Sequence, residues 1–276
     1  MLGPMRTQSE KAQSFRALHE RPGIFVIPNP WDAGSAKLLA ALGFEALATT
    51  SLGYAASIGR NDGTLSREDV LANCRIIADA TELPVSVDLE NCYADEPKKA
   101  AVTMRLAAEA GAVGGSIEDA SGDAAKPIYD FALAVERVAA AVEEARKLPF
   151  PFTVVARAEN FLHGRPDLDD TIRRLQAFAA AGADVLYAPG IRDLPTIRTL
   201  VAAVPKPVNV VMGLADPNLT LQELEAAGVR RVSVGGALAR LALAAVRDAA
   251  LAMREQGSFR WVKDIMPAKE LRATFN

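Results

Sequence analysis

One recurring pattern constrains the fold of this chain more than any other feature. An Ala-rich helical segment ends at a glycine and is followed by a short apolar run with β-branched residues, in segments 40–50, 107–117, 179–189 and 225–235. The glycines of these segments are Gly43, Gly111, Gly182 and Gly228. Glycine suits the position after a helix, where the backbone adopts a positive φ and a Cβ would clash. The pattern therefore predicts four helix-to-strand connections through tight loops.

Four further apolar runs follow proline or aromatic residues, at 24–28, 84–88, 151–159 and 207–213. They are continuous rather than alternating, as expected for parallel strands that are buried on both faces. The intervening segments carry helix start signals. Ser66-x-x-Asp69 and Thr220-x-x-Glu223 resemble capping boxes, and Pro97 suits a first helical position.

The chain thus contains eight predicted strands, each followed by a helix, with an additional polar helix at about 9–20. Strict alternation at this number favours a closed (βα)₈ TIM-type barrel over an open doubly wound sheet. No GxGxxG or GxxxxGK[ST] motif follows any strand, which argues against a nucleotide-binding fold. We predict a single α/β domain over residues 1–276, in which 237–276 form a C-terminal helical segment that serves oligomerisation.

Charge and cysteine content exclude several classes of function. The formal net charge is −3, from 31 basic and 34 acidic residues without long runs of either sign, so neither nucleic acid nor a membrane surface is an expected partner. The two cysteines form no CxxC motif, and two histidines are too few for a multi-histidine metal centre. Without an apolar leader or an 18-residue apolar run, the chain is expected to be soluble and cytoplasmic.

Polar residues collect where the predicted strands end, which is where barrel enzymes place their chemistry. The candidates are Thr50, Ser51 and Leu52 after the second strand, Asp62 in the following loop, Asp88 and Glu90 after the third strand, Glu118 after the fourth, Arg157 after the fifth and Asn209 on the seventh.

Four of these candidates are acids, and they indicate a metal. Asp88 and Glu90 are two residues apart and would lie on one side of an extended chain. With Glu118 and Asp62 close by, repulsion between like charges would raise their pKa values unless a cation neutralised them. Carboxylates and waters are the ligands that Mg²⁺ or Mn²⁺ prefers. Arg157 would hold a substrate carboxylate in a forked pair.

Other roles compete with these interpretations. A strand-end aspartate is often only a loop cap, and Arg157 has the alternative role of neutralising Glu159 or Glu118. A Gly235-Gly236 pair at a helix start suits either an anion or close packing, and we favour close packing. His163 is expected to be solvated.

At these residues the chain resembles the isocitrate lyase/phosphoenolpyruvate mutase superfamily, over nearly its whole length. SLGYAASIGRNDGT is similar to the family's S-L-G-x-x-D segment, and PVSVDLENCYAD to its P-x-x-x-D-x-D-x-G-[YF]-G signature. GGSIEDA is similar to G-x-x-[IL]-E-D, and VVARAE to [IV]-x-A-R-x-[ED]. Four such segments in the family's order make the resemblance specific.

The resemblance implies a site, a reaction and an assembly. Asp88 would contact Mg²⁺, with Glu90, Glu118 and Asp62 supporting it largely through water. Arg157 and the backbone around Thr50, Ser51 and Leu52 would hold a keto-acid carboxylate, and the metal would stabilise an enolate. Family members exchange the eighth helix with a neighbour, which implies a homo-oligomer, a dimer of dimers, and a burial site for the apolar tail that carries Phe259, Trp261 and Ile265.

The chain also departs from the family pattern. Lyases of the family carry a Lys-[KR]-Cys-Gly-His loop after the fourth strand, whereas this chain has EDASGDAAKPIYDF, without Cys or His. Glu90 replaces the second Asp of the signature, Cys92-Tyr93-Ala94 replaces Gly-[YF]-Gly, and Lys126 is expected to be exposed. We expect a Mg²⁺-dependent lyase that cleaves a C–C bond of a small 2-oxo or 2-hydroxy dicarboxylate, by retro-aldol cleavage or decarboxylation. The alternatives are P–C chemistry on a phosphonopyruvate-like substrate and a non-catalytic keto-acid-binding protein.

Overall fold

The structure is a computed structural model in which residues 6–275 are described. Its eight strands are β1 (Phe25–Ile27), β2 (Leu47–Ala48), β3 (Val85–Val87), β4 (Gly114–Glu118), β5 (Thr153–Arg157), β6 (Val185–Tyr187), β7 (Val208–Val211) and β8 (Arg231–Ser233). The helices around them are α1 (Gln8–Glu20), α2 (Ala33–Ala41), α3 (Ser51–Ser57), α4 (Arg67–Asp79), α5 (Pro97–Glu109), α6 (Phe131–Arg146), α7 (Leu168–Ala180), α8 (Leu194–Ala203) and α9 (Leu221–Ala226). The C-terminal part contains α10 (Ala237–Gln256), the 3₁₀ helix η1 (Arg260–Asp264) and α11 (Ala268–Phe275).

All strand pairs of the sheet are parallel, in the order β1-β8-β7-β6-β5-β4-β3-β2. The ring is nearly closed, because the first strand pairs with the last: Phe25, Val26 and Ile27 lie opposite Arg231, Val232 and Ser233. At the seam between β1 and β2, the Ala48 N–H donates to the Pro28 carbonyl over 3.0 Å. The Asn29 side-chain amide also donates to the Thr49 carbonyl over 3.0 Å. The predicted eight-stranded barrel with an additional N-terminal helix is confirmed.

Local signals in the sequence set the element boundaries. The four predicted helix-ending glycines have φ values of +86° to +101°. At Gly182 a Cβ would also lie 2.8 Å from Val142 Cγ1, so this turn needs glycine for packing as well as for conformation. Both predicted capping boxes are present, at Ser66 and at Thr220. Strand β2 is shorter than the apolar run that predicts it, because Thr50 caps α3 instead of continuing the strand.

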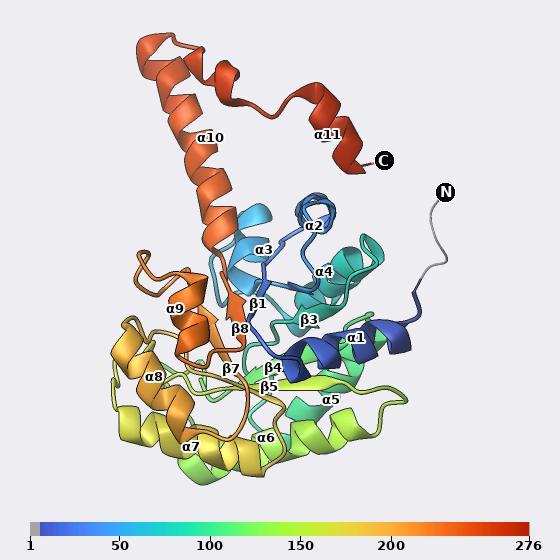
Figure 1. The fold of residues 1–276 in the computed structure, drawn as a ribbon, viewed down its shortest axis with the longest axis vertical. Helices are drawn as coiled ribbons and strands as arrows, with labels where there is room; N and C mark the ends of the chain where they lie inside the picture. Colours follow the sequence, from blue (N-terminus) through green and yellow to red (C-terminus); the bar gives the residue numbers. More distant parts are fainter. Residues whose placement is uncertain (1–5, 276) are drawn as a thin grey trace.

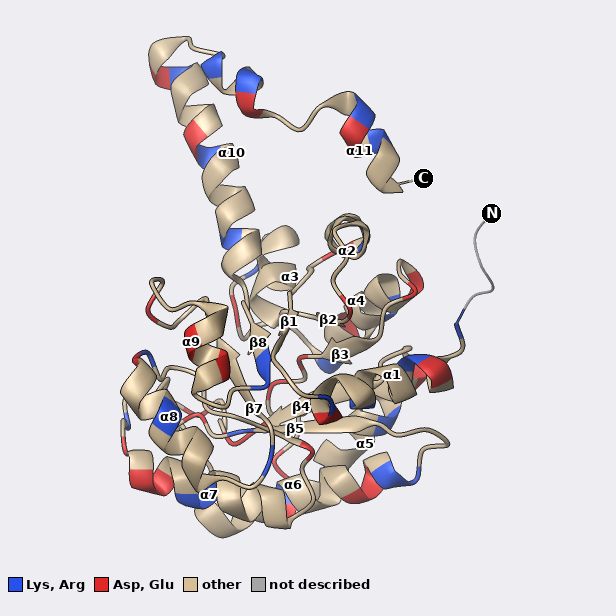
Figure 2. Ribbon diagram, in the orientation of Figure 1, with Lys and Arg blue, Asp and Glu red and all other residues tan. Residues whose placement is uncertain are grey.

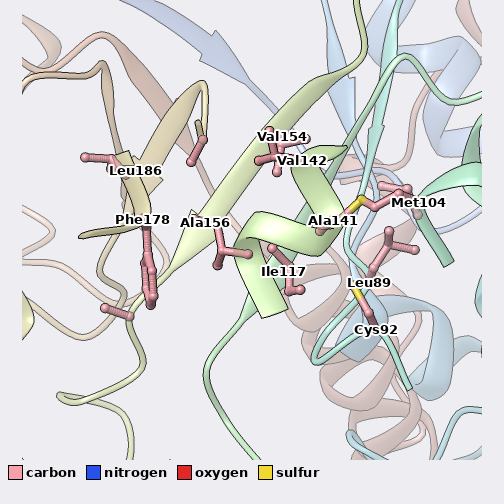
Figure 3. Close-up of a cluster of buried hydrophobic side chains, with 14 of the residues drawn as sticks. Leu89, Cys92, Met104, Ile117, Ala141, Val142, Val154, Ala156, Phe178 and Leu186 are labelled. Atoms are coloured by element: carbon pink, nitrogen blue, oxygen red, sulfur yellow. The ribbon is translucent and has the colours of Figure 1, made fainter. Parts of the chain in front are cut away.

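The core lies between the outer faces of the strands and the surrounding helices (Figure 3). Ile117, Phe178 and Leu186 are completely buried there, and burial of such a side chain stabilises the fold by roughly 1.5–3 kcal/mol. Continuous apolar strands fit this position because one strand face meets the helices and the other faces the barrel interior. The helices thereby hold the strand ends, and the polar residues that follow them, in a fixed ring.

Helix α10, which follows the last strand, projects from the barrel instead of packing along its sheet (Figure 1). Helix α10 extends away from the mouth, and α11 lies beside α2. Of the residues of α10 only Ala239 is buried, whereas Leu241 and Val246 are 67% and 66% exposed. Figure 2 shows long uncharged stretches along α10 between its few charged residues. This apolar surface has no cover within the described part of one chain.

The apolar tail beyond α10 is equally open. Phe259 and Ile265 are 62% and 55% exposed, and Trp261 is half-buried. The burial that the sequence requires for these residues is therefore not supplied by residues 6–275 of the same chain. None of the helices described in this structure combines the length and the apolarity needed to cross a membrane.

Candidate active site

Three carboxylates converge on one guanidinium at the C-terminal mouth of the barrel. Nη1 of Arg157 lies 3.0 Å from Asp88 Oδ1, Nη2 lies 3.2 Å from Glu118 Oε2, and Nε lies 2.8 Å from Glu159 Oε1. The register of β4 against β5 places Glu118 directly opposite Arg157. The side chain of Arg157 is only 14% exposed, so these ion pairs are shielded from water. The alternative role of Arg157, neutralisation of Glu159 and Glu118, is present in this structure.

Asp88 is held on both of its oxygens. Oδ2 accepts the hydroxyl of Ser51 over 3.1 Å, and Oδ1 accepts the hydroxyl of Ser116 over 3.3 Å as well as the bond from Arg157. Its backbone N–H donates to Thr49 Oγ1 over 2.9 Å. These contacts come from the segment after β2 and from β4 and β5, so the position of the Asp88 carboxylate is fixed by the barrel itself. Ser116 is a site residue that the sequence analysis missed.

Glu90 reaches the site by a route that the sequence did not predict. Strand β3 ends at Val87, and Glu90 has a φ of +49°. The expectation that Asp88 and Glu90 share one side of an extended chain is therefore wrong, because Glu90 lies in a turn. Burial and then the nearby Asp88 and Asp62 nevertheless raise the pKa of Glu90 to about 7. The Oε1 atom of Glu90 is buried without a hydrogen-bond partner.

A strained loop carries Glu90. Besides Glu90 itself, Cys92 and Tyr93 have φ values of +59° and +58°. A left-handed conformation costs about 1–2 kcal/mol for each non-glycine residue. The loop is held by Arg137 of α6, which is 1% exposed and donates to the carbonyls of residues 91, 94 and 95.

Arg137 was not recognised from the sequence. Its guanidinium stacks on the ring of Tyr129 at 4.2 Å from the centroid, which adds a second constraint on its position. The one available signal is its place among alanines and valines on the apolar face of α6, where an arginine requires buried partners.

Asp62 stands at the rim of the mouth. Its Oδ1 is 3.5 Å from the hydroxyl of Ser51, and partial burial together with Asp88 raises its pKa. Thr50 has a structural task, because its side chain accepts the Gly53 N–H at the start of α3. The four predicted acids thus surround one place, although only Asp88 and Glu118 contact Arg157.

The side chain of Leu52 leaves no room for a Cβ at Gly236, which lies just before α10. A Cβ on Gly236 would lie 2.5 Å from Leu52 Cδ2. The close-packing interpretation of the Gly235-Gly236 pair is therefore the better one. Leu52 supports the wall of the mouth with its side chain.

A cavity of about 60 Å³ leads from the mouth into the barrel. Thr50, Asp88, Arg157 and Asn209 line it, whereas Ser51 and Leu52 are outside its lining. Asn209 is buried deeper than the acids and donates to the Ser233 hydroxyl over 3.0 Å, while its Oδ1 has no partner. A larger cavity of about 570 Å³ lies at the opposite, N-terminal end of the strands, against His19 and Phe150, and contains none of the predicted site residues.

The carboxylates of the mouth suit a Mg²⁺ ion that keeps most of its water. Among residues 6–275 no three His, Cys, Asp or Glu side chains are close enough to chelate one ion, and Arg157 contacts both Asp88 and Glu118. Mg²⁺ binds to one or two carboxylates and retains several waters. Asp88 as the contacting carboxylate, with Asp62, Glu118 and the unpartnered Oε1 of Glu90 around it, fits this mode. Burial and the neighbouring carboxylates raise the pKa of Glu118 well above its usual range, although Arg157 opposes this.

The segment after β4 differs from a catalytic cysteine loop. It closes on itself, because Ala120 bridges Ile128 and the Ser121 N–H donates to the Pro127 carbonyl over 2.9 Å. Lys126 is exposed at its tip, as expected, and His163 is exposed elsewhere. Burial raises the pKa of both cysteine thiols to about 12, so neither is a thiolate near neutral pH.

Comparisons with known proteins agree with the fold and show the family. The family model for phosphoenolpyruvate phosphomutase matches residues 15–254. The uncharacterized protein Rv1998c of Mycobacterium tuberculosis is 36% identical over 88% of this chain and 89% of its own length. The 2-methylisocitrate lyase of Salmonella typhimurium is 31% identical over 96% and 92% of the two chains. The crystal structure of a Burkholderia cenocepacia J2315 protein assigned to the lyases or mutases is 58% identical, covers 97% and 96% of the two chains, and has a TM-score of 0.95.

Proposed function

Since this chain belongs to the isocitrate lyase/phosphoenolpyruvate mutase superfamily, we propose that it is a Mg²⁺-dependent lyase that cleaves a C–C bond in a small 2-oxo or 2-hydroxy dicarboxylate. The observation that carries the proposal is the arrangement of Asp88, Glu118 and Arg157 at the barrel mouth. This arrangement places the guanidinium of Arg157 beside carboxylates that suit a hard metal ion. The group lies above a cavity of about 60 Å³.

The chain's own residues supply binding and charge balance. Arg157 presents a planar guanidinium, which pairs with a substrate carboxylate in exchange for one of its present partners. Asp88 and the acids around it would hold Mg²⁺. When bound, Mg²⁺ polarises the substrate carbonyl and stabilises negative charge on its oxygen. The fixed bonds from Ser51 and Ser116 keep Asp88 from turning toward Arg157 alone.

The closed loop after β4 favours decarboxylation over retro-aldol cleavage. Retro-aldol cleavage needs a base that removes the hydroxyl proton and an acid that protonates the product carbanion. Decarboxylation of a 3-carboxy-2-oxo acid releases CO₂ and requires only that a proton be added afterwards, which water can supply. Lys126 is exposed and both cysteines are protonated and buried, so the lower acid–base demand of decarboxylation fits this chain better.

We also propose that α10 is exchanged between subunits and that the assembly is a dimer of dimers. The support is the exposed apolar face of α10, which includes Leu241 and Val246, and its departure from the barrel (Figure 1). A helix that follows the last strand of a barrel normally packs against its own sheet. A second copy would cover α10 and fill the place that it leaves.

A turnover panel tests the proposed reaction. Oxaloacetate, 2-methylisocitrate and phosphonopyruvate are each assayed with Mg²⁺ and with EDTA, using wild type and Asp88→Asn. Release of CO₂ and pyruvate from oxaloacetate, lost with EDTA and in the variant, is the expected result. Turnover of phosphonopyruvate alone would replace C–C by P–C chemistry. Metal-dependent binding without turnover of any substrate would indicate a keto-acid-binding protein and overturn the assignment as an enzyme.

A further inference from the structure

A second arginine lies inside the barrel without a counter-charge. Arg231 opens β8, is 5% exposed, and lies opposite Phe25 on one side and Asn209 on the other. Its Nε and Nη1 atoms are buried and have no hydrogen-bond partner. Within residues 6–275 it forms no salt bridge, and its Cζ lies over the ring of Phe15 at 5.9 Å from the centroid.

The other buried arginines of the described chain each have several polar partners, although Nε of Arg137 has none. Arg157 contacts three carboxylates, and Arg137 donates to three backbone carbonyls. Arg174 pairs with Asp119 at 3.0 Å and with Asp170 at 2.8 Å. A buried charge without a partner is strongly unfavourable, so such residues are normally paired. Arg231 differs from these three arginines, because within residues 6–275 it has no salt bridge and its Nε and Nη1 atoms have no hydrogen-bond partner.

The titratable neighbours of Arg231 cannot balance its charge. Burial and then Arg231 itself lower the pKa of His19 to about 3, so this imidazole is neutral. Burial raises the pKa of Tyr187, so its phenol is neutral as well. Burial lowers the pKa of Arg231 to about 10, which leaves the guanidinium charged near neutral pH. A positive charge therefore remains inside the barrel.

The cavity beside Arg231 has the size and the lining of a small anion site. Its volume is about 60 Å³, and Arg231, Asn209 and Ser233 line it below the acids of the mouth. Asn209 also has an unpartnered buried atom, Oδ1. Rotation of this amide by a half-turn would place an N–H donor toward the cavity, since the oxygen and nitrogen of an asparagine side chain exchange roles at little cost. The Ser233 hydroxyl, which accepts from Asn209 Nδ2 in the present orientation, would then donate to Asn209 Oδ1 and hold the rotated amide in place.

We propose that Arg231 forms an interior anion site, which binds one small monoanionic group of halide or carboxylate size between its unpartnered N–H groups and Asn209. Two sources have this chemistry. One is a free ion such as chloride or formate. The other is the distal carboxylate of a dicarboxylate whose first carboxylate is bound at the mouth, and in this form the inference rests on the proposed function. Water alone would fill the cavity but would leave the charge of Arg231 unbalanced.

Thermal melts of the intact protein in EDTA test the free-ion form, independently of turnover. Sodium gluconate, whose anion is too bulky for the cavity, is replaced by chloride or formate at constant ionic strength. The midpoint of wild type should rise and saturate, and that of Arg231→Met should not respond. Arg231→Lys should respond with an affinity at least tenfold weaker, because a lysine lacks the planar set of donors. Arg198→Met, which removes an exposed arginine on α8, should respond like wild type.

A second arm distinguishes the two sources. Malate and lactate, which differ by one carboxylate, are compared in the same melts. An additional stabilisation by malate that disappears in Arg231→Met, without any response to chloride or formate, assigns the site to the distal carboxylate of a ligand. Failure of the proposed reaction in the turnover panel would leave either result unchanged, because neither depends on catalysis.

A crystal of the wild-type protein soaked in bromide gives a direct readout that needs no variant. An anomalous peak within hydrogen-bond distance of Arg231 Nε or Nη1 is the expected result for the free-ion form. The proposal is overturned if no peak is present and if wild type and the folded Arg231 variants respond equally to chloride, formate and malate. If Arg231→Met does not fold, Arg231→Lys and the soaked crystal decide.

Discussion

Nη1 of Arg157 lies 3.0 Å from Oδ1 of Asp88, although the two residues are 69 positions apart in the chain. This contact places the guanidinium of Arg157 at the carboxylate of Asp88, which is the best candidate for a metal ligand. The guanidinium and a divalent ion would therefore act on the same group of acids. In this structure Arg157 limits their repulsion, and under the proposed function a bound metal would leave the guanidinium available to a substrate carboxylate.

Asp88→Asn should remove the response of the protein to Mg²⁺. A ligand that binds only the folded state stabilises it by about 2.7 kcal/mol at a hundredfold excess over Kd. Wild type should show this gain in thermal melts with Mg²⁺ against EDTA, and the variant should gain much less. Glu136→Gln, which changes an exposed acid on α6, serves as the matched control. Equal Mg²⁺ shifts in Asp88→Asn and wild type would end the assignment of Asp88 as a ligand.

Arg157→Gln should destabilise the protein in EDTA by about 3–5 kcal/mol, the usual effect of leaving buried charges without their partner. The loss should be largest near pH 8 and smaller near pH 5. Burial raises the pKa of Glu118, so this acid takes up a proton early as the pH falls and then needs no cation. Urea unfolding of both proteins at the two pH values measures the difference. A loss that does not depend on pH would indicate that Arg157 acts mainly through packing.

Glu90→Gln should stabilise the metal-free protein at alkaline pH. The folded-state pKa of Glu90 is raised to about 7 from 4.5, so its contribution to stability is complete below the lower value and is lost as the pH rises through the upper one. Wild type should therefore lose stability relative to Glu90→Gln between about pH 5 and pH 8. The free energies of unfolding should be equal at the acidic end. A difference in the free energy of unfolding between wild type and Glu90→Gln that stays constant across this pH range would contradict the raised pKa of Glu90.

Arg137→Met should loosen the loop that carries Glu90. The substitution keeps the volume of the side chain but leaves three carbonyls without their donor, and each unsatisfied buried group costs about 1–3 kcal/mol. We expect weaker Mg²⁺ binding and faster amide exchange in residues 90–95. Arg173→Met, at an exposed ion pair on α7, is the control. Unchanged exchange in the loop would show that its strained conformation is held by other contacts.

A Leu241→Glu/Val246→Glu double variant should break the assembly. Both side chains are about two-thirds exposed on α10, and a charge at each would oppose burial against a second copy. Sedimentation at micromolar concentration should give an oligomer for wild type and a smaller species for the variant. Leu162→Glu, on an exposed leucine of another segment, should sediment like wild type. A monomeric wild type would remove the proposed exchange of α10.

The barrel was predictable because its signals are local and repeated. A helix that ends at a glycine and a buried run of β-branched residues each depend on a few neighbouring residues, and the eight repeats leave few other topologies. The places of Asp88, Glu118 and Arg157 followed from the rule that strand ends meet at one mouth. The sequence could not show the ion pairs among them, since side-chain partners depend on the strand register.

The turn at Glu90 was not predictable for a different reason. Nothing in the residue types after Leu89 indicates a left-handed backbone, yet the structure places positive φ values at Glu90, Cys92 and Tyr93. Their conformation is imposed by Arg137, which lies more than forty positions away. Arg231 was equally hidden, because an Arg230-Arg231 pair at the start of a strand gives no sign that the charge of one member is enclosed.

The seam between β1 and β2 bears on how the chain folds. Strand β1 is held in register by β8, whereas a backbone bond from Ala48 to Pro28 joins it to β2. Strand β1 thus lacks its main partner until residues 231–233 have been synthesised. Non-local pairing of this kind slows folding, because a long loop must close before the contact forms. Until then the apolar edge of β1 is exposed to other chains. The nascent protein should therefore depend on chaperones more than a barrel whose β1 and β2 are fully paired with each other.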